Sequence, residues 1–345
     1  MIIDGKKIGS KHKPYVIAEL SANHNGSLER AIEILEMSKK MGADALKLQT
    51  YTQDTITIDS ESEDFVIKNG LWAGQTLYDL YTHAHMPWEW HAPLFEKAES
   101  LELSIFSSPF DETAIDFLED LNCPAYKIAS FEAIDLPLIK YAASTGKPLI
   151  ISTGMANLQE IEEAVVVAKD TGCTELALLH CVSGYPAPAD EYNLKTISDL
   201  KDRFDVEIGI SDHTILNTTA IAAVALGATI IEKHVTLSRN DGGPDDSFSL
   251  EPENLLDLCI SSEIAWQSLG EINYDKKKSE EENIIFRRSL YVIEDITKGS
   301  SITKGNIKSI RPGYGLPPKY FTKVLGMKAN QNLKKGMPLT MDLLK

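Results

Sequence analysis

The sequence predicts an α/β fold, a TIM (β/α)8 barrel followed by a small, mainly β C-terminal domain. Eight short apolar runs alternate with amphipathic helical patterns along most of the chain. The runs are apolar almost throughout, as strands of a parallel sheet buried on both faces require. After the charged segment 276–282 (KKKSEEE) the pattern changes to short strands and turns. A length of 345 residues leaves room for a barrel of about 250 residues and an appendage.

The expected barrel strands are runs of β-branched and aliphatic residues. A segment that can form a helix separates each run from the next, so the repeats indicate a closed barrel. The expected strands cover 15–20, 45–51, 103–108, 125–130, 148–153, 176–182, 206–211 and 229–235.

Amphipathic stretches predict the outer helices. The segments 28–42 and 158–172 each end in glycine, the residue that most often follows the last helical turn. A helix over 252–268 is expected to close the outer ring. The segment 52–87 is too long for an ordinary loop, and we expect it to fold over the barrel mouth as a lid. Alternatively, the aromatic and histidine side chains in and beside it pack among themselves: Trp72, Tyr78, Tyr81, His85 and Trp88.

The change of pattern near the C-terminus predicts the domain boundaries. We expect a barrel domain over 1–275, a charged linker over 276–284 and a second domain over 285–345. The second domain is small for independent stability, so docking onto the barrel or onto a second subunit is expected.

Composition limits the classes of partner. Acidic residues outnumber basic ones by 51 to 34, which gives a net charge of −17 and argues against nucleic acid as a partner. The four cysteines form no CxxC pair, so reduced, buried thiols are expected. No apolar run approaches the roughly 18 residues of a membrane span, and the N-terminus has no signal-peptide pattern. A soluble, cytoplasmic protein without membrane partners is expected.

Polar residues gather where the expected strands end, the face of a TIM barrel that carries active sites. Charged side chains inside a barrel need partners or ligands, so a shared purpose is expected. For any one of them, a buried ion pair such as Glu19 with Lys47 is the alternative. The residues are Glu19, Asn23, His24, Lys47, Gln49, Lys127, Ser130, Glu132, Ser152, Thr153, His180, Tyr185, Ser211, His213, Glu232, Lys233 and His234.

Two histidines end consecutive expected strands, His213 in SDHT (211–214) and His234 in EKHV (232–235). The crossover between these strands returns both imidazoles to one rim, near enough to share a divalent ion with open coordination positions. The alternative is that each ring only satisfies backbone carbonyl groups.

Two lysines, Lys47 and Lys127, place positive charges at the same end of the expected barrel. Together with the hydroxyl groups of Ser130, Ser152 and Ser211 they suit a phosphate or carboxylate ligand. Alternatively, Lys127 forms a Schiff base with a carbonyl substrate. The carboxyl groups of Glu19 and Glu132 are candidates for acid–base catalysis or for binding substrate hydroxyls.

The motifs of the barrel resemble those of the sialic acid synthases, which condense phosphoenolpyruvate with an N-acylated sugar aldehyde. The C-terminal segment, with IRPGYGL at 310–316, is similar to their antifreeze-like (SAF) domain. The resemblance runs through the whole barrel. The motifs are AELSANHNG (18–26), KLQT (47–50), PAYKIASFE (124–132), ISTGM (151–155), LLHCVSGYP (178–186), GISDHT (209–214) and EKHVTL (232–237).

This resemblance implies a role for each matching residue. His213 and His234 would hold a divalent metal, manganese first, with magnesium or cobalt as alternatives. Glu19, Glu132 and Asp245 would contact the sugar, and Arg311 would reach the barrel of the other subunit in a domain-swapped homodimer. Ser183 departs from the family pattern, in which many members carry asparagine. The residues expected to bind phosphoenolpyruvate are Lys47, Lys127, Ser130, Ser152 and Ser211, and Tyr185 matches a further site position.

Within the family, three segments resemble the pseudaminic acid branch: 69–81, 87–91 and 242–252. This branch uses 2,4-diacetamido-2,4,6-trideoxy-altropyranose. The resemblance therefore implies a metal-dependent transferase that forms a nonulosonic acid and releases phosphate by C–O cleavage. The alternative is an N-acetylneuraminate or legionaminate synthase that uses an N-acetylmannosamine-type sugar. A non-catalytic sugar-binding protein is the alternative outside the enzymes.

Overall fold

The computed structural model describes residues 1–70 and 72–345 and divides into two compact units. Leu71, part of the 69–81 motif, lies outside the described residues. The first unit is Met1–Gly270 and the second is Glu271–Lys345. The first is a closed barrel and the second contains a small antiparallel sheet, so the predicted fold class is confirmed.

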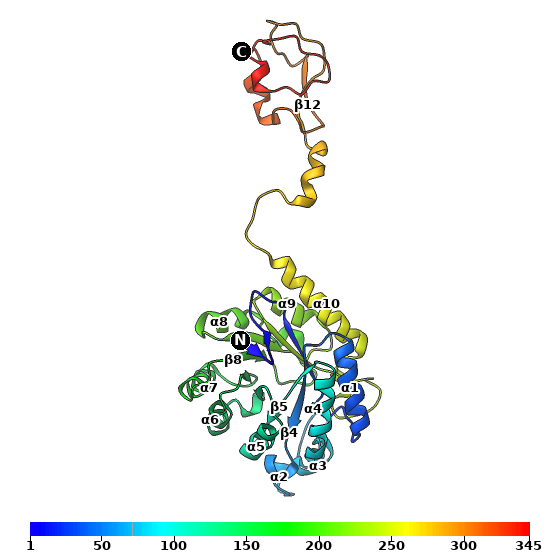
Figure 1. Cartoon of the computed structure of the whole chain (residues 1–345), viewed down its shortest axis with the longest axis vertical. Helices are drawn as coiled ribbons and strands as arrows, with labels where there is room; N and C mark the ends of the chain where they lie inside the picture. Colours follow the sequence, from blue (N-terminus) through cyan, green and yellow to red (C-terminus); the bar gives the residue numbers. More distant parts are fainter. Residues whose placement is uncertain (71) are drawn as a thin grey trace. The chain divides into compact units, whose positions relative to one another are not determined.

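Eight parallel strands close the barrel in the order β10-β3-β4-β5-β6-β7-β8-β9 (Figure 1). Each expected strand is present, with ends that differ from the prediction by a few residues at most. Their bounds are β3 Tyr15–Glu19, β4 Ala45–Thr50, β5 Ser104–Pro109, β6 Tyr126–Ile128, β7 Leu149–Ser152, β8 Leu176–Cys181, β9 Glu207–Ser211 and β10 Ile230–His234.

Helices surround the barrel (Figure 1). The Ser27 side chain caps the first helix by accepting a hydrogen bond from the backbone N–H of Arg30. Gly42 and Gly172 each follow the end of a helix with positive φ (+95° and +101°), as the sequence predicts. The bounds are α1 Leu28–Lys40, α4 His91–Ser100, α5 Glu112–Asp120, α6 Leu136–Ser144, α7 Leu158–Asp170, α8 Lys195–Arg203, α9 Thr218–Ala225 and α10 Pro252–Leu269.

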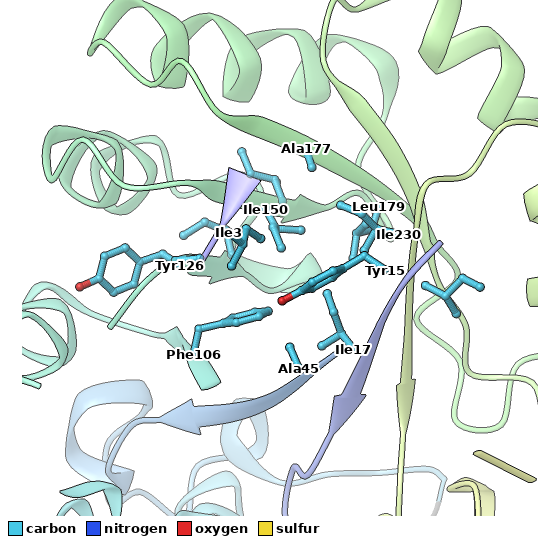
Figure 2. Close-up of a cluster of buried hydrophobic side chains, with 14 of the residues drawn as sticks. Ile3, Tyr15, Ile17, Ala45, Phe106, Tyr126, Ile150, Ala177, Leu179 and Ile230 are labelled. Carbon is cyan, nitrogen blue, oxygen red and sulfur yellow. The ribbon is translucent and has the colours of Figure 1, made fainter. Parts of the chain in front are cut away.

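Large apolar side chains such as the fully buried Phe106 fill the barrel interior (Figure 2). Tyr126 is also fully buried but faces the outer helices, where its hydroxyl group donates to Glu119 of α5. A hairpin that the sequence analysis did not predict, β1 (Ile2–Ile3) with β2 (Lys6–Lys7), adds Ile3 to this core. The core occupies the barrel below the strand ends, so the polar residues collect at the carboxyl face.

The long insertion after β4 contains short helices. They are α2 (Gln53–Ile56), a 3₁₀ turn (Glu63–Phe65), α3 (Leu77–Ala84) and a second 3₁₀ turn (Trp88–Trp90). The Thr76 side chain caps α3 by accepting from the N–H of Asp79. No helix within residues 1–70 and 72–345 combines the length and apolar character that a membrane span needs.

The second unit has its own apolar core, which includes Leu290, Val292 and Ile307. β11 (Ser289–Val292) pairs antiparallel with β12 (Ile307–Ile310). A 3₁₀ helix (Lys278–Phe286) precedes β11 and overlaps the expected linker. The remaining elements are 3₁₀ turns at Pro318–Tyr320 and Met341–Leu343, and the short helix α11 at Phe321–Val324.

Candidate active site

The carboxyl ends of the barrel strands border a cavity of about 590 Å³. Every site residue that the sequence analysis placed in the barrel lines it, whereas Arg311 belongs to the second unit. The roles of these residues stay predictions. The lining residues in question are Glu19, Lys47, Lys127, Ser130, Glu132, Ser152, Tyr185, Ser211, His213, His234 and Asp245.

Five other polar residues lie at or just after the strand ends, as expected, but do not line the cavity. Lys233 shows the reason: it lies between Glu232 and His234, which line the cavity, and alternate residues of a strand face opposite sides. Asn23 instead donates to the carbonyl of Val235 at 2.8 Å. The residues concerned are Asn23, His24, Thr153, His180 and Lys233.

His213 and His234 face each other, with ring centroids 5.3 Å apart and ring planes at 67°. Nδ1 of His213 lies 2.8 Å from the carbonyl oxygen of Val182, which can only accept, so in the neutral ring Nδ1 carries the proton and Nε2 keeps the lone pair. Nδ1 of His234 is buried without a hydrogen-bond partner among the described residues.

Burial, followed by the nearby His213 and lysines, holds the pKa of His234 well below its ordinary value. The ring is therefore neutral near pH 7. A neutral imidazole with a free nitrogen atom, as at His234, suits a divalent ion. At His213, burial opposes protonation, but the hydrogen bond and charge of Cys181 and the carbonyl of Val182 outweigh it and raise the pKa. No group of three or more His, Cys, Asp or Glu side chains in the described part of the chain is arranged to hold a metal. Water and substrate oxygen atoms would have to complete the coordination.

Two lysines and two glutamates form a buried charge cluster in the cavity wall. Nζ of Lys47 lies 2.7 Å from Oε2 of Glu19, and Nζ of Lys127 lies 3.3 Å from Oε1 of Glu232. Glu232 is also 3.9 Å from Lys47. The buried ion pair of Glu19 with Lys47, which the sequence analysis gave as the alternative to a shared role, is thus present. Both of its side chains nevertheless line the cavity, as do those of Lys127 and Glu232.

The two lysines differ in acidity. Burial opposes the charge of Lys47, but Glu19 and Glu232 outweigh it and hold its pKa above the ordinary value. Burial prevails at Lys127 and lowers its pKa despite Glu232. Burial also raises the pKa of Glu19 to about 7, because Lys47 offsets only part of that cost.

Hydroxyl groups gather at the ends of neighbouring strands. Oγ of Ser152 and Oγ of Ser183 are buried without partners among residues 1–70 and 72–345. Oγ of Ser130 accepts from the N–H of Gly154 at 3.2 Å. A Cβ atom at Gly154 would lie 2.3 Å from Oγ of Ser183 and 2.7 Å from Oγ of Ser130, so a larger residue would displace both hydroxyl groups. Unpaired buried hydroxyls are available to an anionic ligand.

Two further carboxyl groups lie in the cavity wall. Burial raises the pKa of Glu132 to about 7, and its Oε2 atom has no partner in the described regions. Asp245 accepts from Oγ of Ser21 at 2.5 Å, and burial raises its pKa. The sequence analysis missed Ser21 and gave no role to Glu232, although Glu232 precedes His234 by two residues on the same strand face.

The insertion contributes mostly apolar side chains to the lining of the cavity, which supports its prediction as a lid. Trp72 and Tyr81 border the cavity, whereas Tyr78, His85 and Trp88 do not. Trp88 stacks on Phe117 instead, with centroids 4.7 Å apart. In the described residues no ring pair joins two of these five side chains: Tyr81 meets Tyr51 and Trp72 meets Tyr185, so the alternative of packing among themselves is not supported. The apolar lining residues of the insertion include Ile56, Ile67, Trp72, Leu77 and Leu80.

Comparisons with known proteins identify relatives over nearly the whole chain. The chain is 44% identical over 333 residues to a pseudaminic acid synthase of Helicobacter pylori, covering 95% of this chain and 97% of the relative. It is 37% identical to an N,N'-diacetyllegionaminic acid synthase of Legionella pneumophila, covering 97% and 95%. A crystal structure of N-acetylneuraminic acid synthetase from Leptospira borgpetersenii superposes with a TM-score of 0.74 at 31% identity, covering 83% and 95%.

Family models match both units. Residues 287–345 match the SAF domain, as the resemblance of the C-terminal segment implies. Residues 34–274 match the NeuB family, and the Helicobacter pylori and Legionella pneumophila relatives are synthases. The chain is therefore an enzyme, and it belongs to the NeuB family.

Proposed function

We propose that this enzyme is a pseudaminic acid synthase. It condenses phosphoenolpyruvate with 2,4-diacetamido-2,4,6-trideoxy-altropyranose and water, and releases phosphate. The observation that carries the proposal is that one cavity holds two kinds of group. Lys47, Lys127 and unpaired serine hydroxyls suit an anion, while the histidine pair, Glu132 and Asp245 suit a carbonyl and hydroxyl groups.

Two observations favour the altrose derivative over an N-acetylmannosamine-type sugar. Identity is higher to the pseudaminic acid synthase than to the legionaminic acid synthase. The insertion also offers an apolar wall, including Leu77 and Leu80, for the methyl group of a 6-deoxy sugar.

His213 and His234 are the residues that would hold the metal, manganese in our proposal. A bound divalent ion would act as a Lewis acid and polarise the sugar aldehyde. Two features of the chain support this assignment: the Nε2 lone pair of His213, and the buried, unpartnered Nδ1 atom of His234.

The other residues orient the reactants and transfer protons. C3 of phosphoenolpyruvate forms a bond with the aldehyde carbon, water adds at C2, and the C–O bond to phosphate breaks. Lys47 and Lys127 stabilise the departing phosphate as cations, without forming covalent bonds. Glu132, with its pKa of about 7, carries a proton that it can donate to the developing alkoxide.

A homodimer that exchanges its second units is part of the proposal. Its support is indirect: Arg311 lies in the second unit and matches the arginine that the resemblance brings to the site of the other subunit. A guanidinium group would add a bidentate partner for an anionic or polyhydroxylated substrate.

One observation favours a second mechanism. The lowered pKa of Lys127 makes its amine a better nucleophile, as a Schiff-base aldolase that uses pyruvate would require. Borohydride in the presence of pyruvate would trap such an intermediate as a covalent adduct on Lys127. We expect no adduct, because Lys127 remains 3.3 Å from the carboxylate of Glu232.

Isotope labelling tests the reaction itself. Phosphoenolpyruvate that carries ¹⁸O in the bridging position should yield labelled phosphate, because the C–O bond breaks and the bridging oxygen leaves with phosphorus. Unlabelled phosphate would show P–O cleavage and overturn the proposed chemistry.

A further inference from the structure

The two residues that directly precede the candidate metal-binding histidines form a buried ion pair. Asp212 precedes His213, Lys233 precedes His234, and both charged residues are almost completely buried. Nζ of Lys233 lies 2.8 Å from Oδ2 of Asp212. Neither residue lines the cavity, so the proposed reaction gives the pair no role.

Lys233 also fixes the chain that follows His213. Its ammonium group donates to the carbonyl oxygens of Thr214 at 2.7 Å and Leu216 at 3.1 Å. With the bond to Asp212, all three of its N–H donors are used. Oδ1 of Asp212 accepts from the N–H of Thr214 at 2.9 Å. One ammonium group on β10 therefore holds the turn that leaves β9.

The main chain of His213 has a second fixed point. The hydroxyl group of Tyr192, a fully buried residue, accepts from the N–H of His213 at 2.7 Å and donates to the carbonyl of Ser211 at 3.2 Å. The last ladder pair between β9 and β10 joins Ser211 with Glu232, so His213 lies beyond the regular sheet. Together with one backbone bond, from the N–H of Ala187 to the carbonyl of His213 at 3.1 Å, these side-chain bonds hold its main chain.

We propose that Asp212, Lys233 and Tyr192 are positioning residues that hold the two imidazoles in register and so set the affinity for a divalent cation. The inference rests on the metal role proposed above. Two histidines are few ligands, and in the described regions no group of three or more metal-binding side chains is formed. Affinity then depends on holding both rings in place before the ion arrives.

The alternative is that the pair serves stability alone. A buried ion pair contributes little net stability compared with apolar residues of similar size. The location of the pair is the more informative property, because the pair joins the two residues that directly precede His213 and His234. A positioning role accounts for that location, whereas a stabilising role does not require it.

Manganese binding to the metal-free full chain tests the inference without substrate. We would measure Mn²⁺ dissociation constants by electron paramagnetic resonance of the free ion, at temperatures well below each variant's melting temperature. Lys233→Met and Asp212→Asn should each raise the dissociation constant at least tenfold. Tyr192→Phe should raise it about threefold, and the visible absorption bands of bound Co²⁺ should shift in all three variants.

Leu255→Ala provides the matched control, because Leu255 is a fully buried residue of α10 that does not line the cavity. It should lower the melting temperature and leave Mn²⁺ affinity unchanged. Wild-type affinity in the three positioning variants would overturn the inference, as would an equal loss in Leu255→Ala. If Lys233→Met fails to fold, Tyr192→Phe decides the question, since it removes a single oxygen atom. A wild-type chain that binds no Mn²⁺ would instead overturn the metal site itself, and this inference with it.

Discussion

Nζ of Lys47 lies 2.7 Å from Oε2 of Glu19, and both side chains are almost completely buried at the cavity. Because removing one partner leaves an uncompensated buried charge, Lys47→Met should lower the free energy of unfolding by about 3–5 kcal/mol. Urea unfolding followed by circular dichroism measures this change.

The double variant Glu19→Gln, Lys47→Met separates stability from function. It should recover most of the lost stability, since neither charge is then left alone. Phosphate release should nevertheless stay at least about 100-fold below wild type, because the cation that holds the anionic substrate is missing. A double variant with wild-type activity would show that the pair is only structural.

The acidity of Glu132 predicts a pH dependence. Burial raises its pKa to about 7, so the carboxyl group is protonated below that pH and can donate a proton. If it is the proton donor, kcat/KM should fall as the pH rises through about 7. Glu132→Gln should lower the rate about 100-fold and abolish this limb of the profile. An unchanged limb in Glu132→Gln would assign it to another group, with Glu19 as the first candidate.

The lid predicts a difference between two tyrosines on one helix. Tyr81 of α3 lines the cavity, and Tyr78 of the same helix does not. Tyr81→Ala should raise the KM for the sugar about tenfold through loss of packing, with little effect on the KM for phosphoenolpyruvate. Tyr78→Ala is the control and should leave both values near wild type. Equal effects in both variants would point to helix stability rather than substrate contact.

Arg311 predicts complementation between subunits. Arg311→Ala and His213→Ala proteins should each be nearly inactive. After subunit exchange, the mixture of the two should regain up to about a quarter of the wild-type activity. The reason is statistical: subunit exchange gives one heterodimer in two, and each heterodimer has one site with both residues intact. Steady-state phosphate release after exchange measures the recovery. No recovery after demonstrated exchange would contradict action in trans.

The sequence predicted the barrel because its signals are local. Apolar runs such as 176–182 and glycines such as Gly42 mark strands and helix ends without reference to distant residues. Strand order follows from consecutive β/α repeats, so it could be predicted as well. The hairpin at β1 and β2 could not, because two-residue strands carry no periodic pattern.

The sequence could predict those residues of the candidate site that lie at the ends of expected strands. Alternation along a strand could have shown which strand-end residues share a face: Lys233 lies at the end of β10, but between Glu232 and His234 it faces away from the cavity. The contact between Ser21 and Asp245 joins positions far apart in the chain. Such contacts follow only from the closed barrel.

Phosphate release from phosphoenolpyruvate after chelator treatment tests the central claim most directly. The assay compares 2,4-diacetamido-2,4,6-trideoxy-altropyranose with N-acetylmannosamine, each with and without added Mn²⁺. The account predicts release with the altrose derivative only, and only when Mn²⁺ is restored. Release with N-acetylmannosamine instead would contradict the assigned sugar, and release that persists without metal would contradict the assigned role of His213 and His234.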